Sequence, residues 1–216
     1  MNEQSDPLNT DTQVIRRDTG VLPYQSITAL IRDGEITAEQ PIRSQQVQPA
    51  SLDLRLGTTA YRMRASFLPG PNRTVHEQIE KFGLHEIDLT SGALLETGCV
   101  YLVPLMESLA LSDGLSGVAN PKSSTGRLDV FTRLITDQAP DFDVVTKGYQ
   151  GPLYAEIFPR TFSVIVRTGT RLNQLRLSRG KPDVREAELK RLLRDQPVLD
   201  RDLTEREVRT LFRGVP

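Results

Sequence analysis

The stretch from Ala119 to Leu177 decides the fold of this chain, because it holds three polar clusters separated by short apolar runs. In order, the clusters read Ala119-Asn-Pro-Lys-Ser-Ser-Thr-Gly-Arg127, Phe142-Asp-Val-Val-Thr-Lys-Gly-Tyr-Gln-Gly-Pro-Leu-Tyr-Ala-Glu156 and Gly169-Thr-Arg-Leu-Asn-Gln-Leu175. Short apolar runs bounded by glycine and proline are typical of strands joined by turns. The polar clusters between them supply the candidate functional residues.

The first cluster contains the hexapeptide Lys122-Ser-Ser-Thr-Gly-Arg127, with two cations, three hydroxyl groups and a glycine. Backbone amides exposed near a glycine, together with hydroxyls and Lys or Arg side chains, bind a phosphate chain through charge-assisted hydrogen bonds. The Gly-x4-Gly-Lys order of a Walker loop is absent. A solvated polar turn has the same composition, so both interpretations stay open for the hexapeptide alone.

The second cluster runs into Pro152-Leu-Tyr-Ala-Glu-Ile-Phe158, a predicted strand bounded by Gly151 and Pro159. Side chains alternate along a strand, so Glu156 shares a face with the two aromatic rings on either side of it. This carboxylate then lies either at a solvated sheet edge or in a semi-apolar pocket. In a pocket, burial makes a carboxylate a usable general acid and base.

Four motifs in one order give the chain a resemblance to a known family. They are Pro49-Ala-Ser-Leu-Asp-Leu-Arg-Leu-Gly57, Lys122-Ser-Ser-Thr-Gly-Arg127, Gly148-Tyr-Gln-Gly-Pro-Leu-Tyr-Ala-Glu156 and Arg171-Leu-Asn-Gln-Leu175. From about Gly20 to Gly180 the chain resembles the dCTP deaminase family, a branch of the trimeric dUTPase superfamily. It looks most like the first half of the long two-domain members. The resemblance implies a mainly β fold, a distorted barrel or jelly roll of the dUTPase-like type, assembled as a homotrimer.

The resemblance also implies an activity: zinc-independent, hydrolytic deamination of dCTP to dUTP and ammonia in pyrimidine deoxynucleotide (dUMP and dTTP) biosynthesis. Mg²⁺ would be carried by the triphosphate, since hard oxygen ligands suit it. The implied catalytic residues are Glu156 as proton shuttle, with Arg127 and Ser123 holding the water and the intermediate. The implied substrate-binding residues are Lys122, Ser124 and Gln174 at the phosphates, Tyr149 against the deoxyribose, and Asp143, with Asp141 as competitor, at the 3′-hydroxyl. Each site would draw on more than one subunit.

Two other functions stay open. A dUTP diphosphatase, or an enzyme that both deaminates dCTP and hydrolyses dUTP, shares the implied fold, but Glu156 together with Arg127 favours deamination. An inactive nucleotide-binding subunit or a fragment is the third interpretation. It stays open because the residues after Gly180 match no part of the segment that covers the triphosphate in short family members. The run Thr136–Lys147 is also a few residues longer than its counterpart there, which leaves open which backbone groups contact the base.

The amino-acid composition argues against several other classes of function. The chain has 216 residues, 38% of them hydrophobic and 25% charged, with a net charge of -1. No global field therefore draws it to nucleic acid or to a membrane surface. Cys99 is the single cysteine and His76 and His85 are the only histidines, so no zinc deaminase centre is expected. The sequence shows no signal or membrane-spanning run, and a cytoplasmic location is predicted.

Three regions are predicted along the chain: a mobile polar tail over residues 1–19, a β-barrel deaminase domain over 20–180, and a charged helical tail or linker over 181–216. Residues 21–34 are predicted to contain a short amphipathic helix, and Thr204-Glu-Arg-Glu207 to form a capping box. The segment from Ala93 to Val118 is expected to form short strands broken at Gly98 and Pro104.

The motif over residues 49–57 alternates leucines with polar residues, which predicts a half-buried strand. We expect Asp53 to support the site or a subunit interface. An Asp53–Arg55 pair on a sheet surface is the alternative.

Overall fold

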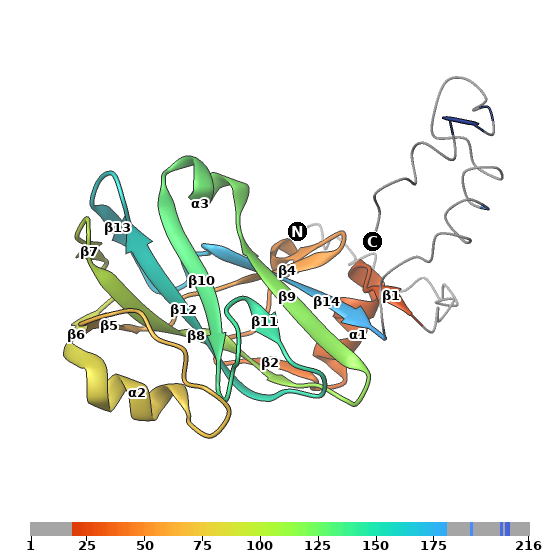
Figure 1. Ribbon diagram of the computed structural model, residues 1–216, viewed down its shortest axis with the longest axis horizontal. Coiled ribbons are helices and arrows are strands. Elements are labelled where there is room, and N and C mark those ends of the chain that lie inside the picture. Colours follow the sequence, from red (N-terminus) through yellow and green to blue (C-terminus); the bar gives the residue numbers. More distant parts are fainter. Residues whose placement is uncertain (1–18, 181–190, 192–203, 205, 208–216) are drawn as a thin grey trace, which may run out of the picture. The chain divides into compact units, whose positions relative to one another are not determined.

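Antiparallel strands dominate the part of the chain that the computed structural model describes, which is residues 19–180 together with 191, 204, 206 and 207 (Figure 1). Within residues 19–180 they form two six-stranded sheets and a two-stranded ribbon. The first sheet has the order β11 (Val144–Val145), β9 (Leu115–Pro121), β14 (Asn173–Arg179), β4 (Ser51–Leu54) and β3 (Val47–Gln48), with β1 (Gly20–Val21) on β14. The second has the order β10 (Val130–Thr136), β12 (Gln150–Pro159), β8 (Val100–Ala110), β5 (Thr59–Met63) and β6 (Gly83–Asp88), with β2 (Ile36–Ala38) on β8. The ribbon pairs β13 (Val164–Val166) with β7 (Ala93–Leu95).

The main hydrophobic core is built by side chains of both sheets. Every second residue of β12 enters it, as the period of a strand requires, and β4 and β14 supply leucines from the other sheet. These residues are Leu153, Ala155, Ile157, Leu52, Leu54, Leu175 and Leu177. The mainly β fold class is therefore confirmed, with the described strands arranged as two open sheets rather than a closed ring.

A second, smaller hydrophobic cluster lies on the opposite face of the second sheet, where the helix α2 (Val75–Phe82) supplies two of its buried side chains. Its buried members are Met63, Val75, Ile79, Leu102, Ile135 and Tyr154. The helix begins with a capping box, in which the Thr74 hydroxyl accepts a hydrogen bond from the Glu77 amide at 3.3 Å. The sheet face that carries Tyr154 is thus partly covered by a helix.

The predicted amphipathic helix is confirmed as α1 (Tyr24–Arg32), with Pro23 as its N-cap. Ile27 and Leu30 are buried, and Gly34 beyond its end has a φ of 79°, a conformation that glycine adopts without strain. Two short helical elements complete the described part, the 3₁₀ turn η1 (Ser44–Gln46) and α3 (Ser123–Arg127).

The prediction that Pro104 breaks the chain between two strands is wrong, since β8 continues through it. Pro104 lies between the residues of β8 that pair with β5 and those that pair with β2. On the other side, the register with β12 shifts between Pro152 and Tyr154, opposite this point. On the edge away from β12, the Gly57 amide donates to the Pro104 carbonyl at 2.8 Å, so the missing amide hydrogen of Pro104 removes only the return bond to this short segment.

The predicted tails lie almost wholly outside the described residues. Beyond Gly180, the structure describes the reciprocal bonds of the predicted capping box: the Thr204 amide donates to Glu207 Oε2 at 3.0 Å and the Glu207 amide to Thr204 Oγ1 at 3.4 Å. The mobile tail over 1–19 and the other helical residues of 181–216 stay predictions. Among the described helices, none is long and apolar enough to cross a membrane.

Candidate active site

Glu156 lies within β12, with Arg133 of β10 and Leu102 of β8 as its partners in the ladders on either side. Only 3% of the residue is exposed. Strands on both sides and its neighbours in the smaller hydrophobic cluster, Leu102 and Tyr154, account for this burial. Of the two settings left open by the sequence, the solvated sheet edge is wrong, because Glu156 is buried beside apolar side chains.

Arg133 is the charge partner of Glu156, and sequence reasoning missed it. Its Nη2 and Nε donate to the same carboxylate oxygen, Oε1, at 2.6 and 3.0 Å. Oε2 of Glu156 forms no hydrogen bond among the described residues. The sequence did hold a signal that Arg133 is functional, because it is a cation in the middle of a strand whose other residues are apolar or carry hydroxyls. Its partner, however, follows only from the register of β10 and β12.

Aromatic rings and a hydroxyl hold the guanidinium of Arg133 in place. Its central carbon lies 3.5 Å from the centroid of the Phe142 ring and 4.9 Å from that of Phe131. Nη2 also donates to Ser66 Oγ at 2.8 Å. A guanidinium stacked on rings and bonded to two oxygens has little freedom to rotate.

The helix α3 carries the predicted Ser123, Ser124 and Arg127 side chains, all of which are exposed. Thr125 anchors the helix by donating to the Leu172 carbonyl at 2.9 Å. Arg127 turns back over one helical turn, so that its Nε reaches the Ser123 carbonyl at 3.3 Å and its Nη2 the Ser123 hydroxyl at 3.5 Å. Within one chain Arg127 does not bond Glu156; its predicted contact with Glu156 concerns a site shared between chains.

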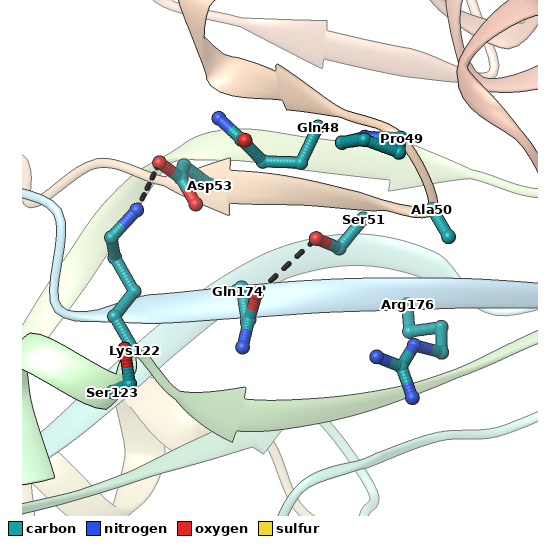
Figure 2. A pocket seen from close by; sticks show the side chains of 9 residues that line it. All are labelled: Gln48, Pro49, Ala50, Ser51, Asp53, Lys122, Ser123, Gln174 and Arg176. Carbon is teal, nitrogen blue, oxygen red and sulfur yellow. Dashed lines mark hydrogen bonds and ion pairs between the residues drawn. The ribbon is translucent and has the colours of Figure 1, made fainter.

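A hollow of about 330 Å³ lies beside the start of α3, over the neighbouring strands β4 and β14 (Figure 2). Its lining residues are Gln48, Pro49, Ala50, Ser51, Asp53, Lys122, Ser123, Gln174 and Arg176. Figure 2 shows Lys122 reaching the carboxylate of Asp53, and Ser51 pointing to Gln174. The Ser51 hydroxyl donates to Gln174 Oε1 at 3.2 Å. Three predicted residues, Lys122, Ser123 and Gln174, therefore meet at one place.

Asp53 is nearly inaccessible, with 1% of its surface exposed. Its Oδ2 binds Lys122 and lies 3.5 Å from Arg171 Nη1, while Oδ1 is buried without a hydrogen-bond partner in the described residues. The alternative of an Asp53–Arg55 pair on a sheet surface is wrong, since Arg55 pairs with Glu107 at 2.7 Å. The strand β4 is buried along its whole length rather than half-buried.

Tyr149 lies just before β12 and is 8% exposed. Its hydroxyl donates to the Pro152 carbonyl at 2.7 Å and accepts from the Asp137 amide at 3.1 Å. Burial is the main reason why the pKa of the Tyr149 hydroxyl is raised above its usual value. The ring also packs so closely on Gly151 that an added Cβ there would meet its Oη at 2.7 Å.

Asp143 occupies the left-handed region with a φ of 62°, which aspartate tolerates better than most residues. Its Oδ1 accepts from the Leu134 amide at 2.7 Å. Burial raises the pKa of the Asp143 carboxyl, nearby Arg133 opposes that rise, and nearby Glu156 adds to it. Asp143 is therefore close enough to both charges to sense them, whereas the competitor Asp141 is exposed.

The predicted residues thus fall into two groups within one chain. Glu156 of β12 and Asp143, in the connection after β10, lie near Arg133, and Tyr149 lies just before β12. Lys122, Ser123 and Gln174 meet in the hollow on the first sheet, and Ser124 and Arg127 lie on α3 beside it. No bond between described residues joins the groups. As for metals, the described residues include no cluster of three or more His, Cys, Asp or Glu side chains suited to bind one.

The fold and these sites define a class: a mainly β protein in which one sheet carries a buried carboxylate bound to a partly exposed guanidinium, and the other carries a cationic hollow. The family model described as the 2′-deoxycytidine 5′-triphosphate deaminase (DCD) N-terminal domain matches residues 18–181. The chain belongs to this family.

Individual relatives agree with this membership. The chain is similar to the dCTP deaminase of Pectobacterium atrosepticum, with 27% identity over 62% of this chain and 70% of that protein. It is also similar to the dCTP deaminase, dUMP-forming, of Persephonella marina, with 29% identity over 64% of this chain and 71% of that protein. The crystal structure of the 2′-deoxycytidine 5′-triphosphate deaminase from Agrobacterium tumefaciens has 54% identity and a TM-score of 0.79, over 83% of this chain. The present chain spans 55% of that structure.

Proposed function

We propose that the protein catalyses the hydrolytic deamination of dCTP, giving dUTP and ammonia for pyrimidine deoxynucleotide biosynthesis. The observation that carries this proposal is the buried carboxylate of Glu156. Its Oε1 is bonded to Arg133, while its Oε2 forms no hydrogen bond with the described residues. Membership in a family named for this deaminase supports the substrate. Relatives that carry the name dCTP deaminase support the reaction.

The reaction needs one group that moves protons around the cytosine ring. Water attacks C4, and its proton passes to Glu156 and then to N3. The second proton on the new oxygen moves to the 4-amino group, the C4–N4 bond breaks, and ammonia leaves. The product keeps a carbonyl at C4 and a proton on N3. A single carboxylate within hydrogen-bond reach of the water and N3 serves each transfer.

The other predicted residues receive roles by their position. Lys122 and Gln174 in the hollow, with Ser124 on α3, would bind phosphate oxygens, and Mg²⁺ would be carried by the triphosphate to neutralise its charge. Tyr149 would pack against the deoxyribose and Asp143 would accept from the 3′-hydroxyl. No zinc takes part in this proposal, since Glu156 and fixed donors polarise the water.

The separation of the two groups of residues supports a site shared between subunits. Ser123 and Arg127 of one subunit would complete the pocket around Glu156 of another, where they would hold the water and stabilise the tetrahedral intermediate. A homotrimer is the assembly proposed, because a closed ring of head-to-tail contacts gives each copy one such site.

Product analysis tests the proposed reaction. The purified chain is incubated with dCTP and Mg²⁺, and separately with dUTP, and the nucleotides are separated by chromatography. We expect dUTP and ammonia from dCTP. Formation of dUMP from dCTP would indicate the dUMP-forming variant of the reaction, and hydrolysis of dUTP with no attack on dCTP would overturn the proposal.

The variant Glu156→Gln tests the proton shuttle. It keeps the shape of the side chain and one acceptor but removes the ability to carry a proton. We expect turnover of dCTP to fall by about 10³-fold while the nucleotide still binds. The matched control is Glu96→Gln, an exposed carboxylate that pairs with Arg62, which should leave turnover unchanged. Normal turnover by Glu156→Gln would show that another group moves the protons.

A further inference from the structure

Arg133 touches Glu156 in a way that distinguishes the two oxygens of the carboxylate. Both of its hydrogen bonds end on Oε1, at 2.6 and 3.0 Å. The side chain of Glu156 is 4% exposed and that of Arg133 is 23% exposed. The guanidinium is therefore the more accessible partner, and the carboxylate is almost completely buried.

The other contacts of Arg133 restrict its orientation. The Phe142 ring lies against the guanidinium, 3.5 Å from its central carbon, and the Phe131 ring lies 4.9 Å away. Nη2, which bonds Glu156, also donates to Ser66 Oγ at 2.8 Å. The orientation of Arg133 is thus set by Phe131, Phe142 and Ser66 as well as by Glu156.

We propose that Arg133 is a positioning residue for Glu156: it fixes Oε1 so that Oε2 is presented to the water and to N3 of cytosine. This inference rests on the proposed deaminase function and adds to it a residue of the same subunit as Glu156. Arg127, from the neighbouring subunit, would then hold the water and stabilise the tetrahedral intermediate. The two guanidinium groups have separate roles.

A fixed carboxylate matters because one oxygen must accept a proton from the water and then donate it to N3. The proton leaves the water and arrives at N3, so Oε2 must lie within hydrogen-bond distance of both. A glutamate free to rotate would spend most of its time in other rotamers, and a displacement of about 1 Å costs roughly 100-fold in rate. Lysine cannot replace Arg133 fully, since its ammonium is a point charge on a flexible stem and lacks the planar fork.

Kinetics of three variants test this role. We expect Arg133→Ala to lower kcat for dCTP by about 100-fold, with KM changed by less than about threefold, because the loss concerns the transition state rather than binding. Arg133→Lys should recover part of kcat. The matched control is Arg62→Ala: Arg62 also lies in the second sheet, pairs with Glu96 at 2.9 Å and stacks on Tyr101. It should keep wild-type kcat.

Chemical rescue separates positioning from a purely structural role. Millimolar methylguanidinium should raise kcat of Arg133→Ala by filling the space beside Phe142, and should leave Arg62→Ala and the wild type unchanged. If Arg133→Ala does not fold, Arg133→Lys, which keeps the charge and most of the volume, decides the question by its kcat and KM.

The possible results distinguish a failure of this inference from a failure of the proposed function. A wild-type chain that forms no dUTP or dUMP from dCTP would overturn the deaminase proposal and this role with it. An active wild type, with Arg133→Ala or a folded Arg133→Lys at undiminished kcat, would overturn only the role of Arg133. A variant that loses affinity for dCTP at unchanged kcat would make Arg133 a binding residue and would also overturn the positioning role.

Discussion

Arg55 and Glu107 form an ion pair almost wholly removed from water, with side chains 9% and 0% exposed. Besides the 2.7 Å contact with Arg55 Nε, Glu107 accepts from the Arg55 amide at 2.7 Å and from Gln46 at 3.0 Å. The other N–H groups of Arg55 reach the carbonyls of Gln40 and Pro41. Such a pair contributes little net stability when complete, but removing one partner leaves the other charge buried.

The variant Glu107→Gln should therefore lower the free energy of unfolding by about 3 kcal/mol, since it leaves Arg55 without a counter-charge. Urea denaturation followed by circular dichroism measures the change. Glu96→Gln is the control, because the Glu96 side chain is 62% exposed, and its loss should cost less than about 1 kcal/mol. Equal losses in the two variants would contradict the expected difference between buried and exposed pairs.

At the scale of elements, Asp137 links α2 to the start of β12. Its Oδ1 accepts from the Val75 amide at 2.6 Å, at the beginning of the helix, and its own amide donates to the Tyr149 hydroxyl. A carboxylate at a helix N-terminus satisfies a free amide and interacts favourably with the helix dipole. One residue thus fixes both a helix and a predicted substrate-binding ring.

Replacing this carboxylate, in Asp137→Ala, should lower the free energy of unfolding by about 1 kcal/mol, the usual cost of losing a helix cap. Thermal or urea unfolding measures the loss. Asp141→Ala, in the same connection but exposed, should have little effect. A full loss in Asp141→Ala, or none in Asp137→Ala, would show that the cap is not what stabilises α2.

The sequence predicted those parts of the fold that depend on local pattern. The period-two alternation around Glu156 placed it correctly with Tyr154 on one face, and the spacing of Ile27 and Leu30 predicted α1. Contacts that depend on register could not be predicted in this way. Glu156 meets Arg133 across 23 residues of sequence, because β10 and β12 pair in one particular register. Shifting that register by one residue would turn Arg133 to the opposite face.

The partner of Asp53 was missed for a similar reason. Lys122 is 69 residues away in sequence, and the two meet because β14 pairs with both β4 and β9. From a sequence pattern alone, only residues close in sequence, such as Arg55, can be proposed as partners of Asp53. The candidate site was therefore predicted as a set of residue types, while its ion pairs came from the topology of the sheets.

At the scale of the whole molecule, the division of the predicted site into two groups gives a test for shared sites. Arg127→Ala and Glu156→Gln should each be inactive alone. Unfolded together in equal amounts and refolded, they should form mixed assemblies in which about one quarter of the sites combine an intact Arg127 with an intact Glu156. We expect about a quarter of wild-type dCTP turnover. The turnover assay must be accompanied by a measurement of the mass of the assembly in solution.

No recovery in mixtures that sediment as trimers would show that Arg127 and Glu156 act within one subunit. A monomeric wild type that is fully active would lead to the same conclusion. Mixing Glu156→Gln with Arg133→Ala provides the control, because both residues belong to the same pocket of the same subunit. That mixture should show no more activity than Arg133→Ala alone.

The proline within β8 has a consequence for how the molecule opens. The residues before Pro104 are bonded to β5 and those after it to β2, while between them the Gly57 amide donates to the Pro104 carbonyl at 2.8 Å and the Met106 amide to the Arg55 carbonyl at 2.9 Å. One edge of β8 is therefore held by three separate segments of the chain, and Pro104 returns no amide bond to the middle one. Loss of the β2 contacts does not require loss of the β5 contacts, so we expect the β2 edge to open locally while the part of β8 beside Glu156 keeps its bonds.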